Sequence, residues 1–335
     1  MQTDSNQLLL HVGYHKTGTT WLQRSLFDHC TRGFYPLSYR SRKKVRSVDL
    51  TRPFVSDENG SSINPLGFHA DSLRSRFELE LNWRTEGIPV VSSEQFTGNP
   101  HSGGFDQKSL AERLHAVFPN AKVFMVVREQ NSMIMSTYFQ YLLGGGIQSL
   151  DRYINEPFDG RLPMFSKHYF QYHFLIDHYQ KLFGRDNVLV LPYELFRRAP
   201  KNFISQLATF SGARIPNDLP FESQENAGRN RVIEYHLRIL APLFVKSSLN
   251  SYSPIAIPRA RWSFKTMKAA LGKLVPDSMH RKFVAAKRAE IASYTDGFYD
   301  ESNKLTSQLI GTDLSEYGYS MGPQMVSRQR DTMAA

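Results

Sequence analysis

The stretch Gly-Tyr-His-Lys-Thr-Gly-Thr-Thr at residues 13–20 has residue types and a spacing that suit the binding of a phosphate group. Four residues separate Gly13 from Gly18, as in a P-loop. The apolar run before this stretch predicts a strand, and the apolar positions after it recur at helical spacing. Backbone N–H groups and the positive end of the helix would then face an anion. The same pattern also fits an ordinary N-cap, in which Thr17 or Thr19 bonds a free amide.

The position of the lysine distinguishes this loop from that of nucleotide-hydrolysing proteins. Those proteins place a lysine directly after the second glycine, where this chain has Thr19. The lysine of this loop is Lys16, three residues past Gly13. Its ammonium group would lie beside the 5′-phosphate of a bound nucleotide and near the group that leaves it. Lys16 would therefore reach a different atom of the nucleotide.

The elements that must position this loop alternate between short apolar strands and amphipathic helices. This alternation is typical of a parallel sheet covered on both faces. We predict an α/β fold, a P-loop-like three-layer domain with a central parallel sheet flanked by helices, in a single domain over residues 1–335. The expected strands are 8–12, 88–92, 121–127 and 187–191; the expected helices are 20–28, 107–117, the stretch after 127, and 201–211.

Two stretches, at about 38–72 and 241–290, are expected to leave this scaffold. The first is polar, and the second is predicted to be helical in its later part, where Met267, Leu271 and Leu274 recur. Excursions from such sheets tend to form substrate sites.

Composition and charge narrow the class of protein. The 335 residues are 41% hydrophobic and 21% charged, which excludes a disordered, collagen-like or coiled-coil chain. A single cysteine, Cys30, excludes an intramolecular disulfide and a multi-cysteine metal site. The N-terminus lacks the pattern of a secretion signal, and no apolar run approaches the roughly 20 residues that span a bilayer. We therefore expect a cytoplasmic protein.

The positive charge is concentrated in the second excursion. The formal net charge is +10, which favours an anionic ligand, a nucleic acid or an acidic surface as partner. Ten Lys or Arg stand against two acidic residues between Lys246 and Glu290, and the rest of the chain is nearly neutral.

The string HVGYHKTGTTWLQ at residues 11–23 resembles the 5′-phosphosulfate loop of the sulfotransferase family. That loop usually reads Pro-Lys-Ser/Thr-Gly-Thr-Thr, followed by an aromatic residue and a leucine; here a histidine replaces the proline. The resemblance implies that the loop binds 3′-phosphoadenosine 5′-phosphosulfate (PAPS) as co-substrate and releases 3′-phosphoadenosine 5′-phosphate (PAP). The implied ligands in the loop are His15, Lys16, Thr17, Gly18, Thr19, Thr20 and Trp21.

The resemblance implies a second contact, with the 3′-phosphate. Family members carry an arginine at the end of a buried strand and a serine eight residues later, and Arg128 and Ser136 match this spacing. Gln130 stands where the family commonly has proline, a preference for starting a helix. Alternatively, Arg128 pairs with a surface carboxylate and Ser136 fills a helix face.

Two further fragments match the family less closely. In VLVLPYELFRRAP, Tyr193 stands where relatives place a tyrosine near the adenine, although a core tyrosine fits equally well. In ENAGRNRVIEYH, Arg229 and Arg231 follow a glycine, similar to a loop that closes over the 3′-phosphate in relatives. A solvated surface is the alternative for these two arginines.

The candidate catalytic base is Glu94, at the end of the strand VVSSEQFTG. Transfer to an alcohol requires a group that takes the hydroxyl proton, and Glu94 lies at the carboxyl edge of the sheet, as the first loop does. Burial beside Phe96 would raise its pKa and Lys16 would lower it. His15 and His101 are alternative bases, and Glu94 could instead bond neighbouring backbone amides.

These residues predict an in-line displacement at sulfur. Glu94 takes the proton of the acceptor hydroxyl, and Lys16 neutralises charge on the bridging oxygen as PAP leaves. No metal is required, because the protein cations do the work that Mg²⁺ does in kinases.

The acceptor is left open by the sequence. The basic excursion, with Trp262 and Phe264 as an apolar face, could recognise an acidic glycan or lie against an anionic membrane to reach a glycolipid. A solvated basic helix is equally compatible, and no nucleic acid is expected. The competing functions are a P-loop kinase of a small molecule and a binding protein for RNA or another polyanion.

Overall fold

A single parallel sheet organises the described part of the chain. The computed structural model describes residues 8–27, 33–37, 51–56, 64–81, 87–156, 160, 163–215, 219, 221, 231–244 and 260–323. Within these residues five strands pair in the order β2-β3-β1-β4-β5, and every pair is parallel. The strands are β1 (Leu9–Gly13), β2 (Phe34–Pro36), β3 (Ile88–Ser93), β4 (Lys122–Val127) and β5 (Val188–Pro192).

The strand order reverses direction beside β1. The chain runs from β1 to the edge at β2, returns through β3, and then crosses to β4 and β5 on the other side. Val12 pairs with Ser93 of β3 and with Met125 of β4, so these strands end level with one another. Ligands of such sheets bind beyond the carboxyl ends of the strands at this point of reversal.

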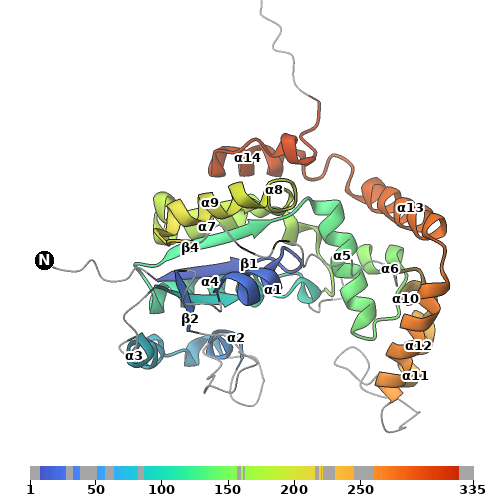
Figure 1. Ribbon diagram of the computed structural model, residues 1–335, viewed down its shortest axis with the longest axis horizontal. Coiled ribbons are helices and arrows are strands. Elements are labelled where there is room, and N and C mark those ends of the chain that lie inside the picture. Colours follow the sequence, from blue (N-terminus) through green and yellow to red (C-terminus); the bar gives the residue numbers. More distant parts are fainter. Residues whose placement is uncertain are drawn as a thin grey trace, which may run out of the picture.

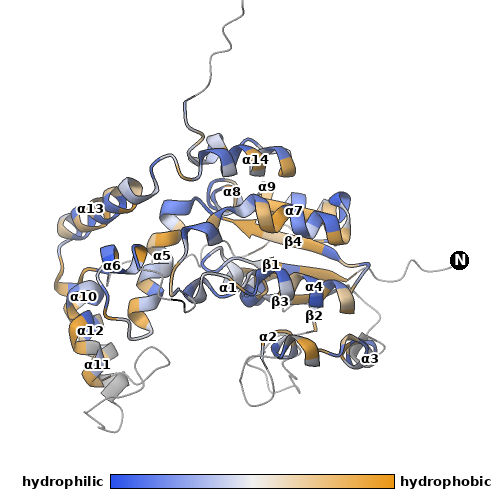
Figure 2. Cartoon of the chain, turned by 180° about the vertical axis from the view of Figure 1, so that it is seen from behind, coloured by the Kyte–Doolittle hydropathy of each residue, from blue (hydrophilic) through white to orange (hydrophobic). Residues whose placement is uncertain are grey.

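Helices cover both faces of the sheet, as predicted. Alternate strand residues face opposite sides: Leu10 and Val12 belong to one buried cluster and Leu9 to the other. The first cluster includes residues of α4 (Gln107–Val117), α5 (Gln130–Leu143) and α7 (Tyr172–Phe183). The second includes residues of α1 (Thr19–Trp21), the π-helix η1 (Leu22–Phe27), α8 (Tyr193–Arg198) and α9 (Pro200–Ser211). In Figure 2, β4 is orange within this packing, whereas α13 and α14 alternate orange and blue.

The remaining elements lie at the ends and sides of the sheet (Figure 1). They are α2 (Arg52–Val55), η3 (Pro65–Gly67), α3 (Ala70–Leu81), η4 (Glu94–Thr97), η5 (Pro100–Ser102), α6 (Leu150–Ile154), η6 (Lys167–Phe170), η7 (Arg185–Asn187), α10 (Arg231–His236), η9 (Leu237–Leu240), α11 (Ala241–Phe244), α12 (Ala260–Leu274), α13 (Asp277–Thr295), α14 (Asp300–Ile310) and η10 (Leu314–Tyr317).

The four predicted strands and the main predicted helices are confirmed to within a residue or two. The three-residue strand β2 was not predicted, because so short a run carries no periodic pattern. Much of the first excursion, 38–50 and 57–63, lies outside the described residues. The second excursion is helical as predicted, in α11, α12 and α13. Figure 1 shows α10, α11 and α12 gathered beside α5 and α6.

The chain returns to the sheet layers after α13. α14 packs on α7, where His173 Nδ1 lies 2.8 Å from the Ser302 hydroxyl. Gln130, at the start of α5, is buried and donates to Asn303 Oδ1 at 2.6 Å. The residue that stands in place of the family's proline therefore ties the start of α5 to α14. In the described ranges, no helix has both the length and the apolar character needed to cross a membrane.

Candidate active site

The loop after β1 has a tight backbone that depends on its surroundings. Lys16 adopts a left-handed conformation with φ 64°, and Gly18 has φ 87°. A left-handed residue with a side chain costs about 1–2 kcal/mol, so other contacts must hold Lys16 in place. The Thr17 hydroxyl closes the turn by donating to the Tyr14 carbonyl at 2.5 Å. Tyr14 is fully buried, with its ring 4.8 Å from that of Tyr172.

The start of the following helix offers hydrogen-bonding groups without partners. Gly18 is the N-cap of α1, and no side chain caps the first turn. The Thr19 hydroxyl is buried and has no hydrogen-bond partner in the described structure. A Cβ atom at Gly13 would lie 2.7 Å from that hydroxyl, so only glycine fits there. Uncapped amides and an orphaned hydroxyl fit a bound phosphate group.

A buried polar network beneath the loop was missed by the sequence reasoning. His11 Nδ1 lies 2.7 Å from the Ser92 hydroxyl, which also accepts from Gln23 Nε2 at 3.0 Å. Burial lowers the pKa of His11 to about 3, so the imidazole is neutral. The network joins β1, β3 and η1 under the loop. A histidine within the apolar run of β1 was the available signal.

Arg128 connects β4 to the loop. Its guanidinium donates to the Lys16 carbonyl at 3.0 Å and lies 5.0 Å from the centre of the Tyr193 ring. A Cβ atom at Gly18 would lie 3.4 Å from the same tyrosine ring. The predicted residues Arg128, Tyr193 and Gly18 are therefore in one place. The Arg128 carbonyl accepts from the Tyr172 hydroxyl at 2.6 Å, which fixes this strand end.

Arg231 brings α10 to the same edge. Its guanidinium lies 5.3 Å from the centre of the Phe139 ring and 3.9 Å from the sulfur of Met135, the residue before Ser136. Burial lowers the pKa of Arg231, and the charges of Arg128 and Arg288 lower it further. In the described structure none of these three arginines forms an ion pair with a carboxylate. Arg128 and Arg231 are half-buried and Arg288 is exposed. Such a group of cations without carboxylate partners in the described structure fits a bound dianion.

The other predicted ligands differ in how well their burial and contacts fit a role in binding. Ser136 is half-buried on α5 beside Met135, and Thr20 is exposed. Trp21 is buried with its ring stacked on Phe221 at 5.5 Å and tilted against Phe196 at 4.9 Å. Its contacts are those of a core residue, and its role as a ligand stays a prediction. Arg229 lies outside the described residues.

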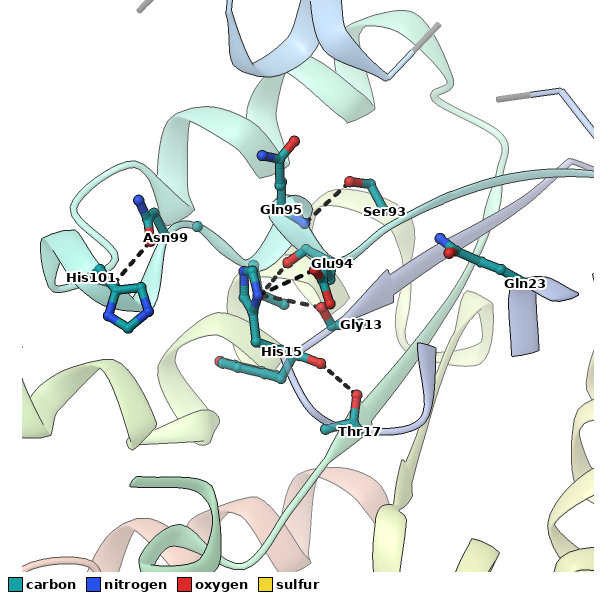
Figure 3. A network of polar contacts seen from close by, with 12 residues as sticks. Gly13, His15, Thr17, Gln23, Ser93, Glu94, Gln95, Asn99 and His101 are labelled. Carbon is teal, nitrogen blue, oxygen red and sulfur yellow. Dashed lines mark hydrogen bonds and ion pairs between the residues drawn. The ribbon is translucent and has the colours of Figure 1, made fainter. Parts of the chain in front are cut away.

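The three candidate bases are His15, Glu94 and His101, which Figure 3 shows in one region of the site. The charge of Lys16 acts on the pKa of each of them. His15 Nδ1 lies 3.5 Å from Glu94 Oε1. Burial raises the pKa of Glu94, and Lys16 opposes that rise, as the sequence predicted. Burial lowers the pKa of both His15 and His101 to about 4, and Lys16 contributes to each shift. Both imidazoles are therefore neutral near pH 7.

A second carboxylate near Lys16 was also missed. Glu234 lies one helical turn after Arg231 on α10 and is half-buried. Burial raises its pKa, and Lys268, Arg231 and Lys16 oppose the rise. Glu234 therefore lies near enough to Lys16 and Arg231 to feel their charges. Its position in a stretch without a recognisable motif gave no signal.

Over the described ranges, no group of three or more His, Cys, Asp or Glu could hold a metal ion. The groups that meet at the carboxyl edge are one lysine, unpaired arginines, two carboxylates and two neutral imidazoles.

Comparison with known proteins decides the family. A model of the sulfotransferase domain matches residues 6–227, which include the loop, β3 with Glu94, β4 with Arg128, and β5 with Tyr193. The chain belongs to the sulfotransferase family. It is accordingly a transferase enzyme that moves a sulfuryl group. No curated protein matches this sulfotransferase in the corresponding search.

Solved structures of sulfotransferases are similar to this chain at low sequence identity. The sulfotransferase from Alicyclobacillus acidocaldarius is 17% identical, with a TM-score of 0.46 over 70% of this chain and 93% of that one. A mouse sulfotransferase complexed with PAP is 12% identical, with a TM-score of 0.38 over 92% of this chain and 90% of that one. The sulfotransferase domain from the curacin biosynthetic pathway is 15% identical, with a TM-score of 0.37 over 63% and 75%.

Proposed function

We propose that this sulfotransferase transfers the sulfuryl group of PAPS to a hydroxyl of a carbohydrate, a glycolipid or another small metabolite. The observation that carries the proposal is the meeting of two groups of side chains at the end of β1. The charge of Lys16 acts on Glu94, and Arg128, which donates to the Lys16 carbonyl, acts on Arg231. A candidate base and a lysine therefore lie next to arginines that, among the described residues, form no ion pair with a carboxylate and suit a second anion.

The donor would be held by two sets of residues. Uncapped amides at Gly18, Thr19 and Thr20 and the Thr19 hydroxyl suit the 5′-phosphate. Arg128, Arg231 and Ser136 suit the 3′-phosphate, and the exposed face of Tyr193 suits the adenine. PAPS, when bound, supplies an activated sulfuryl group whose leaving group is PAP.

Glu94 is the base that the geometry favours. An imidazole is ordinarily more basic than a carboxylate. Burial removes that advantage here, because it raises the pKa of Glu94 and lowers those of His15 and His101 to about 4. Glu94 is also the most exposed of the three toward solvent, with 43% of its side-chain surface accessible.

The residues then divide the work of the transfer. Glu94 takes the proton as the acceptor oxygen forms its bond to sulfur. The bond from sulfur to the bridging oxygen breaks, and its electrons stay on the phosphate. Lys16 stabilises that developing negative charge, and the loop amides keep their contacts with the phosphate throughout. Neither an electron acceptor nor a metal is needed to balance this step.

The corner between α12 and α13 supports an acceptor presented at a membrane surface. Leu274 is 78% exposed and Met279 is 51% exposed. Lys273, Arg281 and Lys282 are close to them in sequence and exposed as well, against one exposed acid, Asp277. A soluble acidic glycan would use the cations but not the apolar side chains, whereas an anionic bilayer would use both. We therefore infer that this corner contacts an anionic membrane that carries the acceptor.

Calorimetric titration tests the donor directly. We expect PAP to bind without Mg²⁺, and ADP and Mg-ATP to bind far more weakly, because neither carries a 3′-phosphate for the arginines. A preference for Mg-ATP would contradict the proposal and would make the chain's loop a kinase loop.

A further inference from the structure

His15 is placed by the fold directly against the candidate base. It lies two residues beyond β1, and Glu94 lies one residue beyond β3, the neighbouring strand. The register pairs Val12 with Ser93, so the two strand ends are level. As a result His15 Nδ1 lies 3.5 Å from Glu94 Oε1, and Figure 3 shows the imidazole directed at the carboxylate.

The charge state of His15 determines whether its contact with Glu94 is an ion pair or a hydrogen bond from a neutral imidazole. Its side chain is only 12% exposed, and burial, with a smaller contribution from Lys16, lowers its pKa to about 4. A neutral imidazole carries one N–H donor and one acceptor nitrogen. A carboxylate only accepts, so the tautomer that suits the contact has its hydrogen on Nδ1.

A hydrogen-bond donor would stabilise the carboxylate form of Glu94. Burial raises its pKa, and among the described residues no hydrogen bond reaches its side-chain oxygens. The charged and titratable groups that face it are Lys16 and His15 from the loop and Tyr169 from η6, which feels the charge of Glu94. Tyr169 is occupied elsewhere, with its hydroxyl 3.2 Å from that of Thr97. Within the described ranges, only His15 lies within ion-pair distance of the carboxylate.

His101 forms the far wall of the same cluster without touching Glu94. Its Nδ1 lies 3.2 Å from the Tyr153 hydroxyl, and its Nε2 is buried without a partner. The charge of His15 contributes to lowering its pKa, so the two imidazoles are neighbours. His101 is therefore a suitable comparison for His15: a buried, neutral histidine in the same cluster, but without contact with the carboxylate.

In the structure His15 Nδ1 approaches Glu94 Oε1 at 3.5 Å but forms no hydrogen bond with any described residue. We propose that His15 is a positioning residue whose Nδ1–H closes this distance and donates to Glu94, keeping the carboxylate ionised and turned toward the acceptor hydroxyl. The role rests on the proposed function of Glu94 as base. His15 itself gains and loses no proton during transfer: the acceptor proton ends on Glu94, and the imidazole stays neutral. The proline usual at this position in the family's loop has no side-chain donor, so it could not make this contact.

The test follows the titration of Glu94 in the whole protein by ¹³C NMR of its carboxyl carbon, which requires no acceptor. In His15→Pro we expect the pKa of Glu94 to rise by roughly 0.7 pH units, the equivalent of one neutral hydrogen bond. His15→Asn should restore part of the difference, because its amide can donate. The matched control His101→Asn should leave the titration unchanged. Amide spectra establish that each variant is folded.

The tautomer of His15 can be measured in the unaltered protein, so the proposal can be tested even if a variant unfolds. The ring ¹⁵N shifts of His15 should report hydrogen on Nδ1 at neutral pH. Hydrogen on Nε2, or an unchanged Glu94 titration in folded His15→Pro, would overturn the proposal. A purely structural role for His15 would instead change PAP affinity and leave the titration alone.

The proposed function and the proposed role of His15 can be contradicted by different results. Loss of PAP binding by the unaltered protein would contradict the proposed donor and would not affect the contact between His15 and Glu94. A rise in the pKa of Glu94 in His15→Pro, with turnover intact in Glu94→Gln, would contradict the base and thereby the catalytic purpose of His15.

Discussion

At the scale of single residues, Lys16 combines chemistry with conformational strain. It is the one non-glycine residue with positive φ in the described ranges, and its charge reaches His15, Glu94, His101 and Glu234. Strain of this kind persists at functional sites because the surrounding structure holds it. The left-handed conformation of Lys16 therefore lowers stability while it places the ammonium group in the site.

Replacing Lys16 should separate these two properties. Lys16→Ala keeps the strained backbone and loses the charge, so turnover should fall by roughly 10²- to 10³-fold or more. Lys16→Gly should lose as much activity, but its free energy of unfolding should be about 1 kcal/mol higher than that of Lys16→Ala. Urea denaturation and the release of PAP from PAPS measure the two effects. Equal stability of the two variants would show that the turn at Lys16 is not strained.

Glu94 should set the acid limb of the pH profile. Because burial raises its pKa above the usual 4.5, the active carboxylate is lost as pH falls through that raised value, and activity should level off above it. Glu94→Gln should lower turnover by roughly 10²- to 10⁴-fold and remove this limb. Turnover should be measured between pH 4.5 and 9. A limb that persists in Glu94→Gln would move the base to a histidine.

At the scale of elements, the residues proposed to bind the 3′-phosphate, together with Arg288 beside them, come from parts far apart in the sequence. Arg128 comes from the end of β4, Ser136 from α5, Arg231 from α10 and Arg288 from α13. Gln130 and Asn303 hold the start of α5 against α14, and Phe283 of α13 lies 6.4 Å from Phe139 of α5. In the proposed site, the helices beyond the loop therefore contribute ligands rather than merely cover it.

Arg128→Ala and Arg231→Ala should each weaken PAP binding by roughly 10- to 100-fold, because each removes a charged hydrogen-bond donor. Neither should change the affinity for adenosine 5′-phosphate, which lacks the 3′-phosphate. Arg198→Ala on α8, where the guanidinium contacts Tyr317 instead, is the matched control. Calorimetry on both ligands makes the comparison. Equal losses for the two ligands would place the arginines away from the 3′-phosphate.

At the scale of the whole molecule, buried neutral histidines make the fold sensitive to acid. Burial lowers the pKa of His11 to about 3 and those of His15 and His101 to about 4, whereas an unfolded histidine titrates near 6.5. Below pH 6.5 the unfolded chain binds protons that the folded chain does not. Stability is therefore complete above pH 6.5 and lost as pH falls toward 4.

Each of these histidines should contribute up to about 1.4 kcal/mol of lost stability per pH unit in that window. His11→Asn should keep a polar group beside Ser92 and reduce the slope by about one proton. His69→Asn at an exposed position is the matched control. Urea denaturation from pH 7.5 to 4.5 gives the slope. An unchanged slope in His11→Asn would mean that His11 is protonated in the folded protein.

The corner between α12 and α13 makes a prediction for membranes. The protein should sediment with vesicles of phosphatidylcholine and phosphatidylserine but not with phosphatidylcholine alone, since each basic residue adds about 1 kcal/mol at an anionic surface. Leu274→Ser with Met279→Ser should release it, and Phe174→Ser, 63% exposed on α7, should not. PAP affinity should be unchanged throughout. Release by charge substitutions alone would point to a soluble acidic glycan.

The individual elements and the chemistry of the loop could be read from local sequence. β4 is apolar from Val123 to Val127, α4 shows a clear helical period, and both begin and end within a residue of their predicted bounds. The lysine inside a glycine-bounded loop predicted an anion site, because that arrangement depends on neighbours in sequence. Glu94 and Arg128 could be placed at the same edge because parallel strands share their carboxyl end.

Only the tertiary structure decided how the separate groups meet. The contact of His15 with Glu94 depends on which strand lies beside β1, and the meeting of Arg231 with Arg128 depends on the path of α10 across α5. Burial, which makes His15 and His101 neutral and raises the pKa of Glu94, is a property of packing and not of residue type. Local patterns determine strands, helices and loop chemistry because these depend on near neighbours. Charge states and constellations depend on atoms brought together from distant parts of the chain, so they follow from the fold alone.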